Sequence, residues 1–118
     1  MKIVFGINTY QHKNEINIRQ LLCLKSLKQI KDKDNKNICL VNLQFTEDNF
    51  SYDVFDKSIQ LKQSSRDYVK NSSYKFPIIS EIFNTLSQQE CDYFVFLNDD
   101  IILQKTFLNR IKEANYDC

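Results

Sequence analysis

One stretch decides the fold of this chain: Tyr93-Phe94-Val95-Phe96-Leu97-Asn98-Asp99-Asp100-Ile101-Ile102-Leu103. Five apolar residues lead into an asparagine and two aspartates, and apolar residues then resume. A continuous apolar run is typical of a strand buried on both faces of a parallel sheet. Because carboxylates are costly to bury without a partner, Asp99 and Asp100 are expected where this strand leaves the sheet. In open α/β sheets, that end of a strand is where ligands bind.

The rest of the chain alternates between apolar runs and segments with helical spacing. We expect strands at 2–8 and 38–45 and a short edge strand near 59–61, in addition to the 93–97 strand. Helices are expected at 15–31, with Asn14 as N-cap, at 77–88, with Pro77 in the first turn, and at 105–115. This order predicts an α/β fold: one domain over residues 1–118, with a mostly parallel open sheet and helices on both faces.

The apolar spacing also predicts which side chains form the core. The second helix is expected to bury an inward stripe, and the third a smaller one. Between residues 46 and 57, four apolar side chains are expected to pack against the core. The predicted residues are Ile78, Ile79, Ile82, Phe83 and Leu86; Phe107, Leu108, Ile111 and Ala114; and Phe50, Tyr52, Val54 and Phe55.

Composition excludes several classes of function. The 118 residues carry a net charge of only +1, which argues against binding nucleic acid or a membrane through bulk charge. A single glycine, Gly6, excludes a P-loop and a G-x-G-x-x-G turn, and a single histidine, His12, excludes a His-rich metal site.

The segments of the chain also bear on its location. No stretch is long enough for a transmembrane segment, and the N-terminus lacks a signal-peptide pattern. The four cysteines match no zinc spacing, so we expect reduced thiols and a cytoplasmic protein.

The acidic pair after the 93–97 strand suggests a divalent cation. Asp100, helped by Asp99, supplies the oxygen ligands that Mg²⁺ and Mn²⁺ prefer, and a phosphate-bearing ligand would complete the coordination. The alternative is an acidic pair that only caps a turn or the last helix.

At this point the chain resembles the family 2-like glycosyltransferases with the GT-A fold. Leu97-Asn98-Asp99-Asp100-Ile101 is similar to their D-x-D region, and residues 3–10 are similar to the opening strand and its nucleotide-facing turn. Leu22-Cys23-Leu24-Lys25-Ser26-Leu27 resembles the first helix, and 75–79 the helix before the metal strand. The resemblance implies a metal-dependent transferase that uses a nucleotide-diphosphate sugar as donor.

The resemblance also implies roles for individual residues. Asp100 matches the metal ligand, Asp99 is a second ligand or a donor contact, and Asn98 stands where the family often has its first aspartate. The resemblance implies that Thr9, Tyr10 and Asn42 contact the base, with Glu47 or Asp48 as alternatives to Asn42. It implies that Arg66 and Lys75 contact phosphate. The alternative for Tyr10 is a half-buried aromatic residue of a loop, and for Glu47 and Asp48 a solvated acidic loop. For Arg66 and Lys75 the alternative is ordinary surface charge, and His12 is expected to be an exposed bystander.

Three readings of the function remain open. The first is a glycosyltransferase, or its donor-binding portion with a partner chain supplying the distal acceptor half, because the family's fold extends well beyond the D-x-D region. The second is a degenerate, non-catalytic domain that binds another subunit. The third is a phosphohydrolase or receiver-like module, which is disfavoured because Asn8-Thr9-Tyr10 places no carboxylate after the first strand.

Overall fold

The computed structural model describes residues 1–10, 17–48, 53–71, 75–104 and 106–114. His12, Asn14, Phe50 and Tyr52, about which the sequence made predictions, lie outside these ranges. The strands are β1 (Ile3–Asn8), β2 (Ile38–Gln44), β3 (Lys57–Gln60) and β4 (Tyr93–Leu97), and the helices are α1 (Ile18–Lys33), α2 (Ile79–Ser87) and α3 (Phe107–Ala114). Short 3₁₀ turns cover Thr46–Asp48 and Ser65–Asp67.

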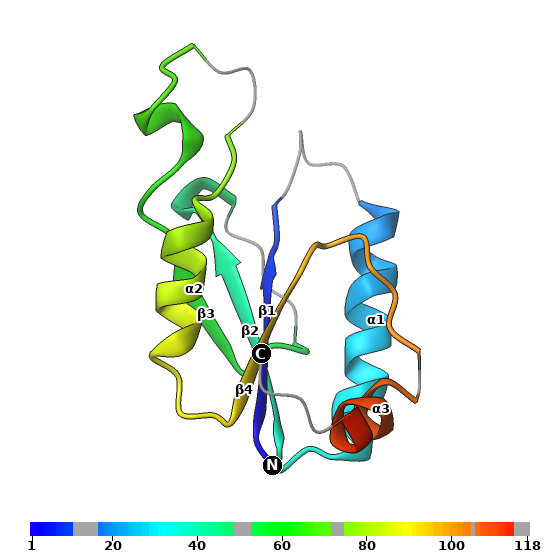
Figure 1. The fold of residues 1–118 in the computed structure, drawn as a ribbon. Coiled ribbons are helices and arrows are strands. Elements are labelled where there is room, and N and C mark those ends of the chain that lie inside the picture. Colours follow the sequence, from blue (N-terminus) through cyan, green and yellow to red (C-terminus); the bar gives the residue numbers. More distant parts are fainter. Residues whose placement is uncertain (11–16, 49–52, 72–74, 105, 115–118) are drawn as a thin grey trace.

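The four strands form one parallel sheet in the order β3-β2-β1-β4. In Figure 1 the sheet is seen nearly edge-on, with α1 and α3 on one side and α2 on the other. This arrangement confirms the predicted α/β class, the parallel pairing and the helices on both faces.

A separate apolar core lies on each face of the sheet. On the α1 side, Phe5 and Ile7 of β1 pack with Leu27 of α1, and Phe5 also contacts the ring of Phe107 in α3 at a centroid distance of 6.0 Å. On the α2 side, Val4 packs with Ile82 and Leu86. Alternate residues of β1 therefore serve opposite cores, as the apolar run at 3–7 requires. Val54 and Phe55 also pack against the α1-side core, as predicted.

Gly6 of β1 lies directly against Leu86 of α2. A Cβ atom at this position would be 2.7 and 2.8 Å from the two methyl carbons of Leu86 and 3.2 Å from a methyl carbon of Leu43. The absence of a side chain at Gly6 thus lets α2 pack directly on the centre of the sheet.

Two predicted helix starts are wrong. Helix α1 begins at Ile18, and its N-cap is Asn17, whose side chain accepts a hydrogen bond from the Gln20 backbone N–H. Helix α2 begins at Ile79, and Pro77 precedes it in an isolated antiparallel bridge with Ser64. In both cases the helical pattern was extended too far toward the N-terminus, because apolar periodicity does not mark where the first hydrogen-bonded turn forms.

Burial corrects two further predictions. On α2 only Ile82 and Leu86 are buried, whereas Ile79 and Phe83 are exposed. Strand β4 is an edge strand of the described sheet, and Phe94 is 39% exposed rather than buried. The apolar content of β4 identified a strand but not its place in the sheet.

None of the described helices has both the length and the hydropathy that a membrane crossing demands.

Candidate functional site

The predicted acidic pair lies at the carboxyl edge of the sheet, beside its topological switch point. The connection from β1 leads to β2 on one side, while β4 pairs with β1 on the other side. Asp99 and Asp100 follow β4, and Thr9 and Tyr10 follow β1, so the two segments leave adjacent strands at the same edge. A crevice at such a switch point is where open α/β sheets bind their ligands.

The N-terminus of α1 meets the acidic pair at this edge. The Asn17 side-chain amide donates to Asp99 Oδ2 at 3.5 Å, while its Oδ1 accepts from the Gln20 N–H at 3.2 Å. One turn further along, the Cys23 thiol donates to the Asn98 carbonyl at 3.8 Å. Asn17 therefore joins the start of α1 to the end of β4.

Two neighbouring carboxylates, Asp99 and Asp100, lie at this edge of the sheet, and Asp99 is partly removed from solvent. Burial raises the pKa of Asp99, and the neighbouring charge of Asp100 raises it further. The pKa of Tyr10 is also raised, first by burial and then by the charges of Asp99 and Asp100, while a hydrogen bond from Asn17 opposes the shift. The side chains that interact in this cluster are Tyr10, Asn17, Asp99 and Asp100. The two carboxylates give the cluster an excess of negative charge.

Thr9 and Asn42, both predicted to contact the base, lie inside the protein. Each is fully buried, and Thr9 Oγ1 donates to Asn42 Oδ1 at 2.5 Å. They link the ends of β1 and β2 and hold the turn that presents Tyr10, which is 44% exposed. Thr9 and Asn42 therefore position the site, and Tyr10 is the residue of the three that faces solvent.

A buried glutamine lies beneath the turn after β1. Gln20 is fully buried, and its Oε1 accepts from the Tyr10 backbone N–H at 3.1 Å. Within the described residues, its Nε2 has no hydrogen-bond partner. A buried amide donor without a partner is unusual in native structures and marks this part of the sheet edge as polar.

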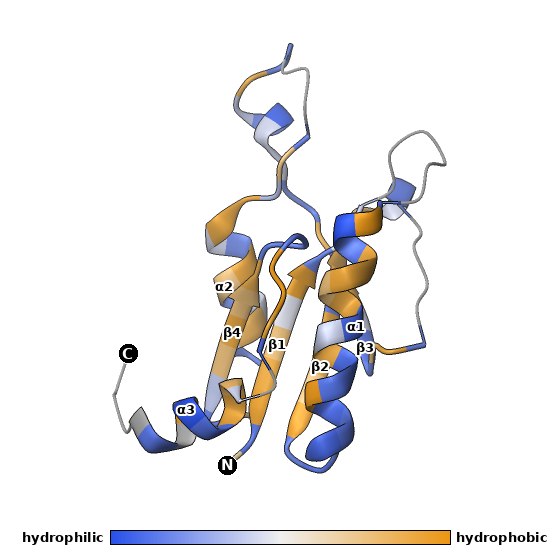
Figure 2. Cartoon of the chain, turned by 90° about the vertical axis from the view of Figure 1, so that its right-hand side faces the viewer, coloured by the Kyte–Doolittle hydropathy of each residue, from blue (hydrophilic) through white to orange (hydrophobic). Residues whose placement is uncertain are grey.

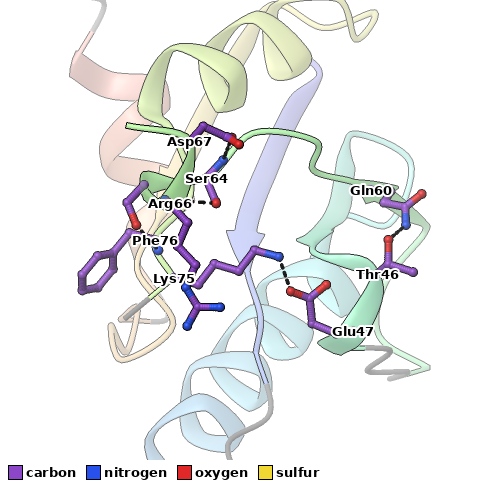
Figure 3. Close-up of polar contacts among 9 residues, drawn as sticks. Thr46, Glu47, Gln60, Ser64, Arg66, Asp67, Lys75 and Phe76 are labelled. Carbon is purple, nitrogen blue, oxygen red and sulfur yellow. Dashed lines mark hydrogen bonds and ion pairs between the residues drawn. The ribbon is translucent and has the colours of Figure 1, made fainter. Parts of the chain in front are cut away.

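Arg66 and Lys75 belong to a second group, near the ends of β2 and β3. Lys75 pairs with the carboxylate of Glu47 (Figure 3). The Nζ of Lys75 also lies 4.2 Å from the centroid of the Phe45 ring. The hydrogen bond from Lys75, with a smaller contribution from Arg66, lowers the pKa of Glu47. No described contact joins these two basic residues to Asp99 or Asp100, so Lys75 is engaged by Glu47 rather than by the acidic pair.

A shallow open pocket lies beside this second group. It is lined by Gln44, Phe45, Thr46, Ser58, Ile59 and Gln60, from the carboxyl ends of β2 and β3. The side-chain amide of Gln60 donates to Thr46 Oγ1 across it (Figure 3).

Sequence reasoning missed Asn17 and Cys23 as neighbours of the 98–100 segment, and it missed Gln20 as the partner of the Tyr10 backbone. The spacing of Asn17 and Gln20 is that of an N-cap and its N3 residue, and this signal could have located the start of α1. No local signal indicated that Gln20 would be buried beside the turn after β1, because that depends on how α1 packs on the sheet.

The donor set fits a divalent cation that takes most of its ligands from elsewhere. Within the described residues, no group of three or more His, Cys, Asp or Glu side chains is placed to hold a metal ion. Asp99 and Asp100 therefore supply at most two carboxylates. Mg²⁺ is commonly bound through one or two carboxylates with phosphate and water as the other ligands. Burial is the main cause of the raised pKa of Asp99, and the repulsion from Asp100 that adds to it is what a bound cation would relieve.

The chain matches no protein-family model, no curated protein and no solved structure.

Proposed function

We propose that this chain is the donor-binding part of a metal-dependent glycosyltransferase with a GT-A-like fold. The observation that supports it best is the acidic pair Asp99–Asp100 beside the switch point of a parallel sheet, next to the exposed ring of Tyr10. This arrangement suits a nucleoside diphosphate, whose negative phosphates need a cation beside carboxylates and whose base can stack on an aromatic ring.

Each residue has a defined part in this proposal. Asp100 and Asp99 would hold Mn²⁺ or Mg²⁺, and the cation would neutralise the negative charge of the departing diphosphate. Tyr10 would contact the nucleoside, which would extend toward the pocket at the ends of β2 and β3. Asn17 orients Asp99, and the buried Thr9–Asn42 pair fixes the turn that carries Tyr10. Asn98, which is exposed, would contact sugar or ribose hydroxyls.

We also propose a cytoplasmic location. The described cysteines Cys23, Cys39 and Cys91 are free thiols, which suits a reducing compartment.

A thermal-shift experiment tests the donor site. Ligand at about a hundred times its Kd contributes about 2.7 kcal/mol, which raises the melting temperature of a chain of this size by about 10 °C. We expect a UDP- or GDP-sugar to produce this shift with Mn²⁺ and little shift without it. Asp100→Ala should abolish the shift, and Asp53→Ala, at an exposed turn, should leave it intact. An equal shift in both variants, or none in the wild type, would count against the proposal.

A second candidate function is a non-catalytic subunit-interaction domain, and the exposed edge strand favours it. Among the described residues no strand pairs with the outer edge of β4, where Phe94 is 39% exposed and contacts the exposed Phe83 at a centroid distance of 6.0 Å. Unprotected apolar edges pair readily with other chains. Light scattering after size exclusion should then show association that Phe94→Lys abolishes. A monomer that still binds nucleotide would exclude this candidate.

A further inference from the structure

A buried side-chain amide connects the first turn of α1 to the turn that carries Tyr10. Gln20 is fully buried, and its Oε1 accepts a hydrogen bond from the Tyr10 backbone N–H at 3.1 Å. Figure 2 shows that α1 starts at the same edge of the sheet at which β1 ends. The hydrogen bond from Tyr10 to Gln20 therefore ties the backbone of the site's exposed aromatic residue to the helix.

Two hydrogen bonds fix the orientation of Gln20. Its backbone N–H donates to Asn17 Oδ1 at 3.2 Å, and its side-chain carbonyl is engaged by Tyr10. Because the carbonyl end of the amide is occupied, the position of Nε2 is fixed as well. Among the residues that the structure describes, none accepts a hydrogen bond from Nε2, although this atom is removed from solvent. The buried amide thus uses its acceptor and leaves its donors unpaired.

Stability alone does not account for an amide at this position. A buried donor without a partner costs at least as much free energy as an ordinary hydrogen bond contributes. Methionine has a side chain of similar length and would bury apolar atoms there without an unpaired donor. An apolar side chain, however, cannot accept a hydrogen bond from the Tyr10 N–H. The effect that distinguishes glutamine at position 20 is therefore the placement of Tyr10.

The same turn of α1 reaches the acidic pair through Asn17. The Asn17 side-chain amide donates to Asp99 Oδ2 at 3.5 Å, and the Asn17 side chain also interacts with the Tyr10 hydroxyl. Asn17 and Gln20 are three residues apart, so they are neighbours on one face of the helix. The first turn of α1 therefore contacts both the acidic pair and Tyr10.

We propose that Gln20 is a positioning residue for the nucleoside, because its side-chain carbonyl fixes the turn on which the Tyr10 ring meets the base. This inference rests on the proposed function and assigns Gln20 to the nucleoside half of that site. Without the acceptor, the turn would lose one of its constraints. Part of the binding free energy would then be spent on ordering it. Nucleotide affinity should fall, whereas the stability of the fold should not.

Calorimetric titration of the full chain with uridine or guanosine diphosphate, in excess Mg²⁺, tests this inference. Gln20→Met should weaken binding of the diphosphate roughly fivefold, the equivalent of about one hydrogen bond. Its melting temperature should equal or exceed that of the wild type, because the unpaired amide is gone. Hydrogen exchange at the Tyr10 backbone N–H should be faster in the variant, while the amides of β2 keep their rates. A residue with a merely structural role would lower stability together with affinity.

Gln89→Met is the matched control, because it is the same substitution at the opposite edge of the sheet, between α2 and β4. Gln89 Nε2 donates to the Thr85 carbonyl at 3.2 Å, and its Oε1 accepts from Lys57 Nζ at 3.0 Å. This variant loses hydrogen bonds but should bind the diphosphate like the wild type. Gln20→Leu also lacks an acceptor and should behave as Gln20→Met does, so one folded member of that pair is sufficient.

The results separate this inference from the proposed function. If the wild type binds neither diphosphate, the proposed function fails and the inference fails with it. If the wild type binds but the folded Gln20 variant binds equally well, the inference alone is overturned. Equal weakening in Gln89→Met, or an unchanged exchange rate at the Tyr10 N–H, would also overturn the inference alone.

Discussion

Replacing the single glycine of the chain tests how closely α2 packs on the sheet. Alanine in a strand ordinarily stabilises relative to glycine by about 0.5–1 kcal/mol. At Gly6 the added methyl group would meet both methyl carbons of Leu86 at 2.7 and 2.8 Å, and Leu86 is fully buried. Overpacking of a well-packed core costs about 1–3 kcal/mol. We therefore expect Gly6→Ala to destabilise the protein by about 1–2 kcal/mol, which lowers its melting temperature by about 4–8 °C.

Leu86, which the methyl group of alanine at position 6 would contact, provides the control. Leu86→Ala alone should cost about 2–5 kcal/mol, because it leaves a cavity under α2. The double variant should be more stable than the sum of the two losses predicts, by at least about 1 kcal/mol, because alanine at 86 makes room for alanine at 6. Urea unfolding of the four proteins measures this coupling. A Gly6→Ala variant that is more stable than the wild type, or a coupling of zero, would refute the close approach of α2.

Three further predictions concern the site. Burial and the charge of Asp100 raise the pKa of Asp99 in the folded protein, so the free energy of unfolding falls as pH rises through that pKa. Asp99→Asn removes this loss and should therefore raise the melting temperature of the metal-free protein at pH 7. The gain should shrink toward acid pH, where Asp99 is protonated in both states. The exposed control Asp53→Asn should show no such pH-dependent gain. Asn17→Ala should cost about 1 kcal/mol in urea unfolding, through loss of the α1 N-cap, and a serine at this position should recover most of it. Burial raises the pKa of Cys23 to about 11, so only about one Cys23 thiol in a thousand is ionised at pH 8. Because the thiolate is the reactive form, mass spectrometry should find Cys23 alkylated more slowly than the partly exposed Cys39.

The sequence predicted the elements because their signals are local. The apolar runs of β1, β2 and β4 and the alternation with helices were sufficient for the parallel sheet. Strand order depends on contacts between distant segments, and for that reason β4 was expected to be buried on both faces although it lies at an edge of the described sheet. The exposure of Ile79 and Phe83 has a similar cause: periodicity gives a stripe on α2, but the sheet covers only the part of it around Ile82 and Leu86.

The candidate site was partly predictable for a related reason. A carboxylate pair after an apolar strand must lie at a strand end, and the switch point then brings Tyr10 near it. Whether a polar residue faces the ligand or the core cannot be read from its type. Thr9 and Asn42 were expected to touch the base, but the packing of the strand ends turns them inward to each other. Arg66 and Lys75 were expected at phosphate, and Lys75 is instead paired with Glu47.

The central claim is that Asp99 and Asp100 hold a cation against a nucleoside diphosphate, and nuclear magnetic resonance with Mn²⁺ tests it most directly. Paramagnetic Mn²⁺, added with uridine or guanosine diphosphate, should first broaden the backbone amide signals of Tyr10, Asn17 and residues 98–100. Asp100→Ala should remove that broadening. Broadening centred instead on Glu47 and Asp48, or unchanged in Asp100→Ala, would contradict the account.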